Sequence, residues 1–96
     1  MTQLNSIKKV LFELKPELVE KYHVNLIGLF GSVVRDDFRP SSDIDIIVDF
    51  SGPVGIEFID LAEFLEKRLK RHVDLVSKNG IKEKYYREIE PEIVYV

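Results

Sequence analysis

The spacing of apolar residues divides the first quarter of the chain into two helical segments. Between residues 6 and 15, apolar side chains recur every three or four positions, which predicts an amphipathic helix with Asn5 or Ser6 as its N-cap. Pro16 interrupts this stripe and suits the first turn of a second, shorter helix. The apolar positions of the two helices are Ile7, Val10, Leu11, Leu14, Leu18, Val19 and Tyr22.

Shorter apolar runs, rich in strand-forming residues, occupy much of the remaining chain. We expect strands over residues 24–30, 43–50, 72–76 and 92–96. Residues 56–71 predict the clearest helix, because their apolar side chains share one face and their acidic and basic ends complement the helix dipole. Asn79-Gly80 predicts a turn into a short helix that carries Ile81, Tyr85 and Ile89. Helices that alternate with strands around one sheet predict an α/β or α+β fold, and the length fits a single domain over residues 1–96.

Composition narrows the class of protein. The net charge of -3 argues against general coating of nucleic acid, although a local basic pocket is compatible with it. The absence of cysteine excludes disulfides and thiolate metal sites, and with only two histidines a zinc site would need carboxylates as well. The sequence shows no signal peptide and no apolar stretch of membrane-spanning length, so we expect a cytoplasmic protein that does not bind membranes.

Two aspartates open the most apolar of the expected strands. Residues i and i+2 of a strand share a face, so Asp43 and Asp45 point one way while Ile44 and Ile46 point into the core. Two ionised carboxylates about 4 Å apart repel by roughly 4 kcal/mol at an effective dielectric constant near 20. A divalent cation would turn that repulsion into attraction, and oxygen ligands favour magnesium or manganese.

A third carboxylate is available on the next expected strand. If residues 72–76 pair with residues 43–50, Asp74 lies about one strand spacing, 4.8 Å, from the aspartate pair. Asp49 shares the face of Asp43 but lies roughly 13 Å further along the strand, too far to join the site.

A glycine-serine pair follows directly after the first expected strand. Backbone N–H groups at Gly31-Ser32 can approach an anion closely, and the Ser32 hydroxyl adds a donor. Arg35 can pair with phosphate oxygens, and residues 36–42 form a loop by composition. An anion cradle next to metal-binding carboxylates is the set of groups that phosphoryl-type transfer requires.

These residues resemble a known signature. Gly31-Ser32, ten intervening residues and then Asp43-Ile44-Asp45 are similar to the GS-x10-DxD motif of the polymerase-β-like nucleotidyltransferases. The segments LFGSVVR and SDIDIIV resemble those of the minimal nucleotidyltransferases (MNT), and the resemblance extends from residue 24 to the C-terminus. Many relatives carry a small residue and a glycine where this chain has Val34 and Asp36.

The resemblance implies a role for each residue of the motif. It places two magnesium ions, with manganese as a substitute, on Asp43, Asp45 and Asp74, and makes Asp74 the residue that activates the acceptor hydroxyl. It places the triphosphate on Gly31 and Ser32, with help from Arg35, and a partner protein is expected to complete a pocket that so short a chain leaves open.

The resemblance also implies a biological setting. We expect a magnesium-dependent antitoxin that transfers AMP from ATP to a tyrosine of a cognate HEPN-type RNase toxin. A second hypothesis is a non-catalytic antitoxin that blocks the toxin by contact, with vestigial aspartates. A third is transfer to a small molecule such as an aminoglycoside, but those relatives usually carry a substrate domain that this sequence lacks.

Overall fold

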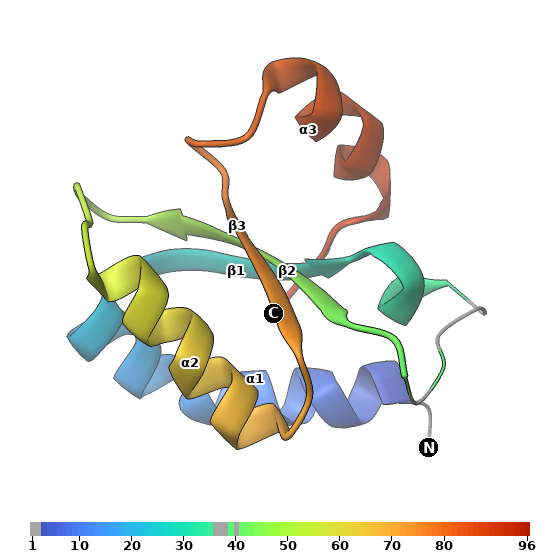
Figure 1. Ribbon diagram of the computed structural model, residues 1–96, viewed down its shortest axis with the longest axis horizontal. Coiled ribbons are helices and arrows are strands. Elements are labelled where there is room, and N and C mark those ends of the chain that lie inside the picture. The colour runs from blue at the N-terminus through green and yellow to red at the C-terminus, as the bar shows by residue number, and fades with distance from the viewer. Residues whose placement is uncertain (1–2, 36–38, 40) are drawn as a thin grey trace.

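The computed structural model describes residues 3–35, 39 and 41–96, and Figure 1 shows how their elements are arranged. Helices alternate with strands, as the sequence pattern predicts. In chain order the elements are α1 (Gln3–Tyr22), β1 (Val24–Phe30), the 3-10 helix η1 (Gly31–Val34), β2 (Ile44–Phe50), α2 (Glu57–Leu69), β3 (Val73–Ser77), α3 (Glu83–Ile89), the 3-10 helix η2 (Glu90–Glu92) and β4 (Val94–Tyr95). No helix among these described residues is long and apolar enough to cross a membrane.

The four strands form one mixed sheet in the order β3-β2-β1-β4. β1 is antiparallel to both β2 and β4, whereas β2 and β3 run parallel. A parallel pair needs a crossover connection, and α2 supplies it between β2 and β3. The predicted α/β class, a small mixed sheet flanked by helices, is therefore confirmed.

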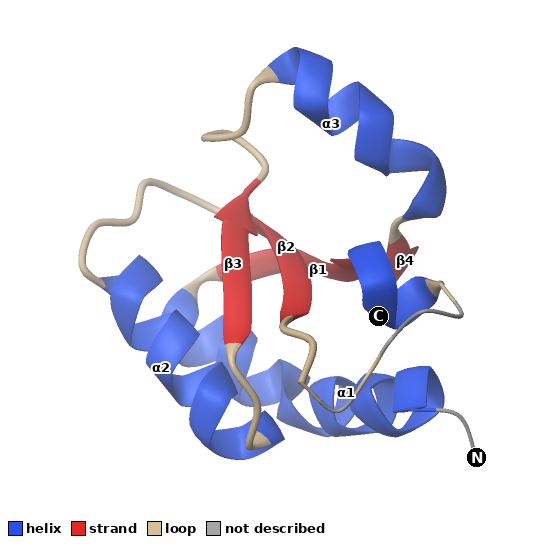
Figure 2. Ribbon diagram, turned by 45° about the vertical axis from the view of Figure 1, so that its right-hand side comes forward, coloured by secondary structure: helices blue, strands red, loops and turns tan. Residues whose placement is uncertain are grey.

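The helices divide between the two faces of the sheet. α1 and α2 cover one face, and α3 lies on the other (Figures 1 and 2). The main apolar cluster lies between α1, α2 and the sheet, and its fully buried members include Leu11, Leu18, Ile27, Leu29, Ile44, Ile46, Val48, Leu61 and Leu65. A smaller cluster beneath α3 consists of Phe30, Ile47 and Ile89, with Val76, Ile81, Tyr86 and Ile93 packed against it.

The first helical segment differs from the sequence prediction, because α1 continues through Pro16 as one helix. Ile7, Leu11, Leu14 and Leu18 form a buried stripe on both sides of the proline, and burial of that stripe outweighs the roughly 3 kcal/mol that an internal proline costs. The helix already includes Gln3, so neither predicted N-cap residue caps it. Val19 is 53% exposed and does not join the stripe.

Most other predicted boundaries are correct to within two residues. β1 has the predicted bounds, whereas β2 begins at Ile44 and leaves Asp43 just before the strand. Near the short helix α3, Ile81 and Ile89 pack in the smaller cluster as predicted, but Tyr86 packs there in place of Tyr85, which is 46% exposed. Within the predicted loop over residues 36–42, residues 36–38 and 40 lie outside the described part of the chain.

Candidate active site

Two carboxylates meet on the sheet face that carries α3. The parallel pairing of β2 with β3 places Asp45 directly beside Asp74, as the sequence predicts. Because side chains alternate along a strand, Ile44 and Ile46, which flank Asp45, point to the opposite face, where both are fully buried. The main apolar core therefore holds the two carboxylates in register.

The electrostatics of Asp45 reflect this crowding. Partial burial, followed by the negative charges of Asp74 and Asp43, raises the pKa of Asp45 from 3.8 to about 6, and the positive charge of Arg35 opposes the increase. A raised carboxyl pKa means that the ionised form is disfavoured in the folded protein. The environment of Asp45 would accommodate a cation better than a second negative charge.

The glycine-serine bend lies against the same carboxylate. Phe30, the last residue of β1, pairs with Asp45 across the sheet, and Gly31 begins η1 directly afterwards. Gly31 adopts a φ of 75°, in the left-handed region that favours glycine. A Cβ at this position would collide with Asp45 Oδ2, so the close approach of backbone to carboxylate also requires glycine. Ser32 follows in η1, where its carbonyl oxygen accepts a hydrogen bond from the Arg35 N–H at 3.1 Å.

A fourth carboxylate reaches the bend from the C-terminal part of the chain. The N–H of Gly31 donates a hydrogen bond to Glu92 Oε1 at 2.9 Å. The other oxygen of Glu92 lies 3.4 Å from Arg35 Nη1. Glu92 thus contacts two of the groups that the sequence assigns to phosphate binding.

Asp43 lies at the edge of this group. Its side chain is 56% exposed, and its Oδ1 atom lies 3.6 Å from Nδ1 of His72, which in turn lies 3.7 Å from Glu66 Oε2. Asp43 remains close enough for its charge to raise the pKa of Asp45. The predicted pairing of Asp43 with Asp45 is therefore present as an electrostatic interaction, with Asp43 itself turned toward His72.

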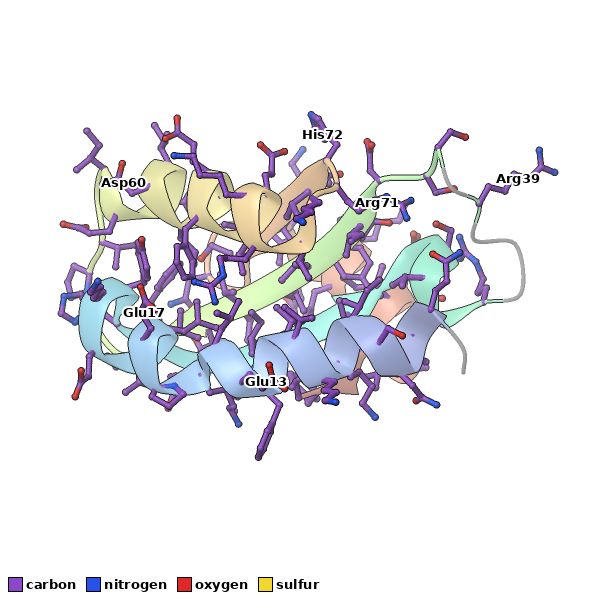
Figure 3. All side chains as sticks on the ribbon, turned by 90° about the horizontal axis from the view of Figure 1, so that it is seen from below. Glu13, Glu17, Arg39, Asp60, Arg71 and His72 are labelled. Carbon is purple, nitrogen blue, oxygen red and sulfur yellow. The ribbon has the colours of Figure 1, made fainter. Side chains whose placement is uncertain are left out.

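Arg71 fixes the turn that precedes these aspartates. One of its nitrogens, Nη2, donates hydrogen bonds to the carbonyl oxygens of Ser42 at 2.6 Å and Arg39 at 2.9 Å. In Figure 3 the Arg71 side chain points toward this turn, whereas Arg39 extends outward from it. Arg71 therefore ties the start of β3 to the residue immediately before Asp43.

The structure thus brings the predicted site residues to one end of the sheet. Asp45, Asp74 and Gly31 are in direct proximity, Asp43 and Arg35 act on Asp45 through their charges, and Ser32 continues the bend. Sequence reasoning missed two residues, Glu92 and Arg71. Glu92 belongs to a short C-terminal run without a motif, and Arg71 belongs to a basic stretch that is explained by the helix dipole alone.

The carboxylates of the site are suited in part to a divalent metal ion. Oxygen-only donors and the raised pKa of Asp45 fit magnesium or manganese. In the part of the chain that the structure describes, however, no three His, Cys, Asp or Glu side chains are grouped closely enough to enclose a metal ion. The residues present therefore fit an open, two-carboxylate site on Asp45 and Asp74, with Asp43 nearby.

Comparison with known proteins agrees with this geometry. Residues 11–96 match the nucleotidyltransferase domain family. The chain is 42% identical over 97 residues to protein adenylyltransferase MntA of Thermococcus cleftensis, an alignment that covers 100% of this chain and 98% of that protein. It superposes with a TM-score of 0.79 and 27% identity on a solved structure provisionally named a minimal nucleotidyltransferase, covering 98% of this chain and 95% of the other.

A toxin–antitoxin complex with AMP-PNP contains a similar chain. Its TM-score is 0.71 at 28% identity, with 97% of this chain and 71% of that chain covered. The chain described here therefore belongs to the nucleotidyltransferase family, among its minimal members related to antitoxins, and it is a nucleotidyltransferase.

Proposed function

We propose that the protein is a magnesium-dependent antitoxin that transfers AMP from ATP to a tyrosine of a cognate HEPN-type RNase toxin. The observation that carries this proposal is the close approach of Asp45, which pairs with Asp74, to the Gly31 bend, because it brings groups suited to a cation beside groups suited to an anion. The relative named protein adenylyltransferase supports AMP as the group transferred. The complex with AMP-PNP supports ATP as the donor and a toxin as the partner.

The proposed reaction exchanges one bond at phosphorus. The tyrosine oxygen forms a bond to the α-phosphorus of ATP, the bond from that phosphorus to the bridging oxygen breaks, and pyrophosphate leaves. Asp74, exposed beside Asp45, accepts the proton of the tyrosine hydroxyl. The Gly31 and Ser32 backbone and Arg35 hold the triphosphate in line with the incoming hydroxyl.

Magnesium held by Asp45 and Asp74, with Asp43 nearby, would neutralise charge on the triphosphate and lower the pKa of the acceptor hydroxyl. The carboxylates also have a positioning role. Because they fix the place where the cation would bind, they would orient the α-phosphate of ATP toward the toxin tyrosine.

The toxin is proposed to complete the substrate pocket. α3 and its apolar cluster cover only part of their face of the sheet, and the carboxylate end is bordered by exposed residues such as Asp43 and Asp74. The small sheet and three helices described here offer little surface to enclose both ATP and a tyrosine. The partner therefore supplies both the acceptor and one wall of the site.

The direct test is incubation of the protein with ATP, magnesium and the cognate toxin, followed by mass spectrometry of the toxin. We expect AMP on a tyrosine, and none when Asp45→Asn replaces the wild type. Absence of AMP from a toxin that demonstrably forms a complex with the wild-type protein would contradict the proposal.

The alternative is neutralisation by contact alone. The double variant Asp43→Asn with Asp45→Asn separates the two functions, because it removes negative charge on the site while leaving the main apolar core unchanged. We expect the variant to bind the toxin but to lose suppression of toxicity. Suppression that survives in the double variant would instead favour a non-catalytic antitoxin.

A metal-binding test requires no toxin. Because the carboxylates repel one another without a cation, magnesium is expected to raise the Tm of the wild type more than that of the same double variant. Equal shifts in Tm, measured by calorimetry, would show that the free protein has no preformed magnesium site.

A further inference from the structure

We propose that Glu92 competes with the triphosphate for Gly31 and Arg35 and thereby sets the affinity of the protein for nucleotide. This inference rests on the proposed ATP site and adds to it an internal carboxylate that must leave before ATP binds.

The contacts of Glu92 are those that a phosphate would make. One carboxylate oxygen accepts the Gly31 N–H at 2.9 Å, and the other lies 3.4 Å from the Arg35 guanidinium. Backbone N–H groups and guanidinium groups bind carboxylates and phosphates through the same geometry. A bound triphosphate and Glu92 therefore cannot both use these two donors fully.

The position of Glu92 is fixed by the elements that follow it. Ile93 packs so closely on β1 that a Cβ at Gly28 would come within 2.7 Å of its Cγ2 atom. Val96 then donates a hydrogen bond to the Ile27 carbonyl at 2.9 Å and continues the pairing of β4 with β1. The sheet therefore presents the Glu92 carboxylate to the bend.

The free energies of the two states explain why such a contact is useful. Gly31 is buried, and a buried N–H without a partner costs about 1–3 kcal/mol. Glu92 provides that partner when ATP is absent, and a phosphate oxygen provides it when ATP is bound. With 29% of its side chain exposed, Glu92 already contacts solvent and can be hydrated after it is displaced.

Two substitutions weaken the contacts of Glu92 in different ways. Glu92→Gln removes the negative charge, and Glu92→Asp keeps the charge but shortens the side chain by one methylene. Both weaken the contacts with Gly31 and Arg35, so we expect the Kd for ATP to fall by about three- to tenfold in each. Glu88→Gln, on the exposed side of α3, changes the net charge by the same amount and is expected to leave the Kd unchanged.

The experiment is calorimetric titration of the protein with AMP-PNP and magnesium. Tighter binding by both Glu92 variants, with a smaller effect of Glu92→Gln in an Arg35→Gln background, is the expected result. Unchanged or weaker binding by the Glu92 variants would overturn the inference. If one variant fails to fold, the other provides the same test.

The outcome is distinguishable from failure of the proposed function. Wild-type protein that binds AMP-PNP but transfers no AMP from ATP to the toxin would refute the transfer reaction and leave the Glu92 comparison intact. Binding detected only in the Glu92 variants would support the inference in its strongest form. Absence of binding in every variant would overturn the inference, whereas the proposed transfer reaction is judged separately by the presence of AMP on the toxin.

Discussion

The two faces of the sheet are built from alternate residues of the same strands, yet they differ in nearly every physical respect. Toward α1 and α2, β2 presents Ile44, Ile46 and Val48, none more than 1% exposed. Toward α3, the same strand presents Asp45 and Asp49, which are both half-buried, with one buried isoleucine between them. The β2 side chains on the first face are shielded from water, whereas those on the second face include carboxylates that contact solvent.

The difference shows how a short chain can hold carboxylates together. Burial on the α1–α2 face fixes the register of β2 against β3 because a shift by one residue would move the apolar set into solvent. That register then places Asp45 beside Asp74 despite their repulsion. The free energy gained by burying the apolar face offsets the electrostatic repulsion between the carboxylates on the other face.

The largest effect is expected from breaking the apolar face. Ile46→Ala removes a fully buried side chain and should lower the free energy of unfolding by about 2–5 kcal/mol, measured by urea denaturation. Ile56→Ala is the matched control, since Ile56 is 70% exposed, and it should change stability by less than about 0.5 kcal/mol. Similar losses in the two variants would refute the contrast between the faces.

A smaller effect is expected where the two faces meet at the glycine-serine bend. Gly31→Ala forces a side chain into a left-handed conformation and against Asp45, so we expect a loss of about 1–3 kcal/mol in unfolding free energy and weaker ATP binding. Gly52→Ala has open space around its Cβ and serves as the control. If Gly31→Ala bound ATP with normal affinity, the glycine-serine bend would not be part of the nucleotide-binding site.

On the charged face, the ionisation of Asp45 should make the free energy of unfolding depend on pH. Because folding raises the pKa of Asp45 from 3.8 to about 6, the folded state holds this proton more tightly than the unfolded state. The contribution of Asp45 to stability is therefore complete below about pH 3.8 and is lost as the pH rises through about 6.

Asp45→Asn removes that dependence. Since Asp45 is only partly buried, solvent screening reduces the effect, and we expect the variant to be more stable than the wild type by roughly 1–2 kcal/mol at pH 7.5. The advantage should disappear near pH 4, as measured by urea denaturation without magnesium. An advantage of constant size at both pH values would contradict a raised pKa.

The smallest effect is expected at the turn before Asp43. Arg71→Lys keeps the charge but replaces a planar donor that contacts two carbonyl oxygens, so it should cost about 0.5–1.5 kcal/mol of unfolding free energy. If the turn also positions the metal donors, the magnesium concentration for half-maximal transfer should rise while the KM for ATP changes little. Arg87→Lys, whose exposed side chain pairs with Glu83 on α3, is the control.

Much of the fold and the central site could be predicted from the sequence. Alternation along residues 43–50 defined both faces of β2, and the spacing of Gly31-Ser32 from the aspartates predicted an anion site beside a cation site. The continuous α1 could not be predicted, because local preference at Pro16 is opposed by burial of a stripe that only the sheet creates. The orientation of Asp43 toward His72 likewise depends on where β3 begins.

The sequence by itself determined which residue types could perform the chemistry, because side-chain period and motif spacing are local properties of a chain. Only the tertiary structure decided that Glu92, 61 positions after Gly31, accepts a hydrogen bond from the Gly31 N–H, the group that we propose binds a phosphate. That contact depends on β4 closing against β1. Pairing between strands that are far apart in the sequence follows from the packing of the whole sheet, so the residues around Glu92 do not predict it.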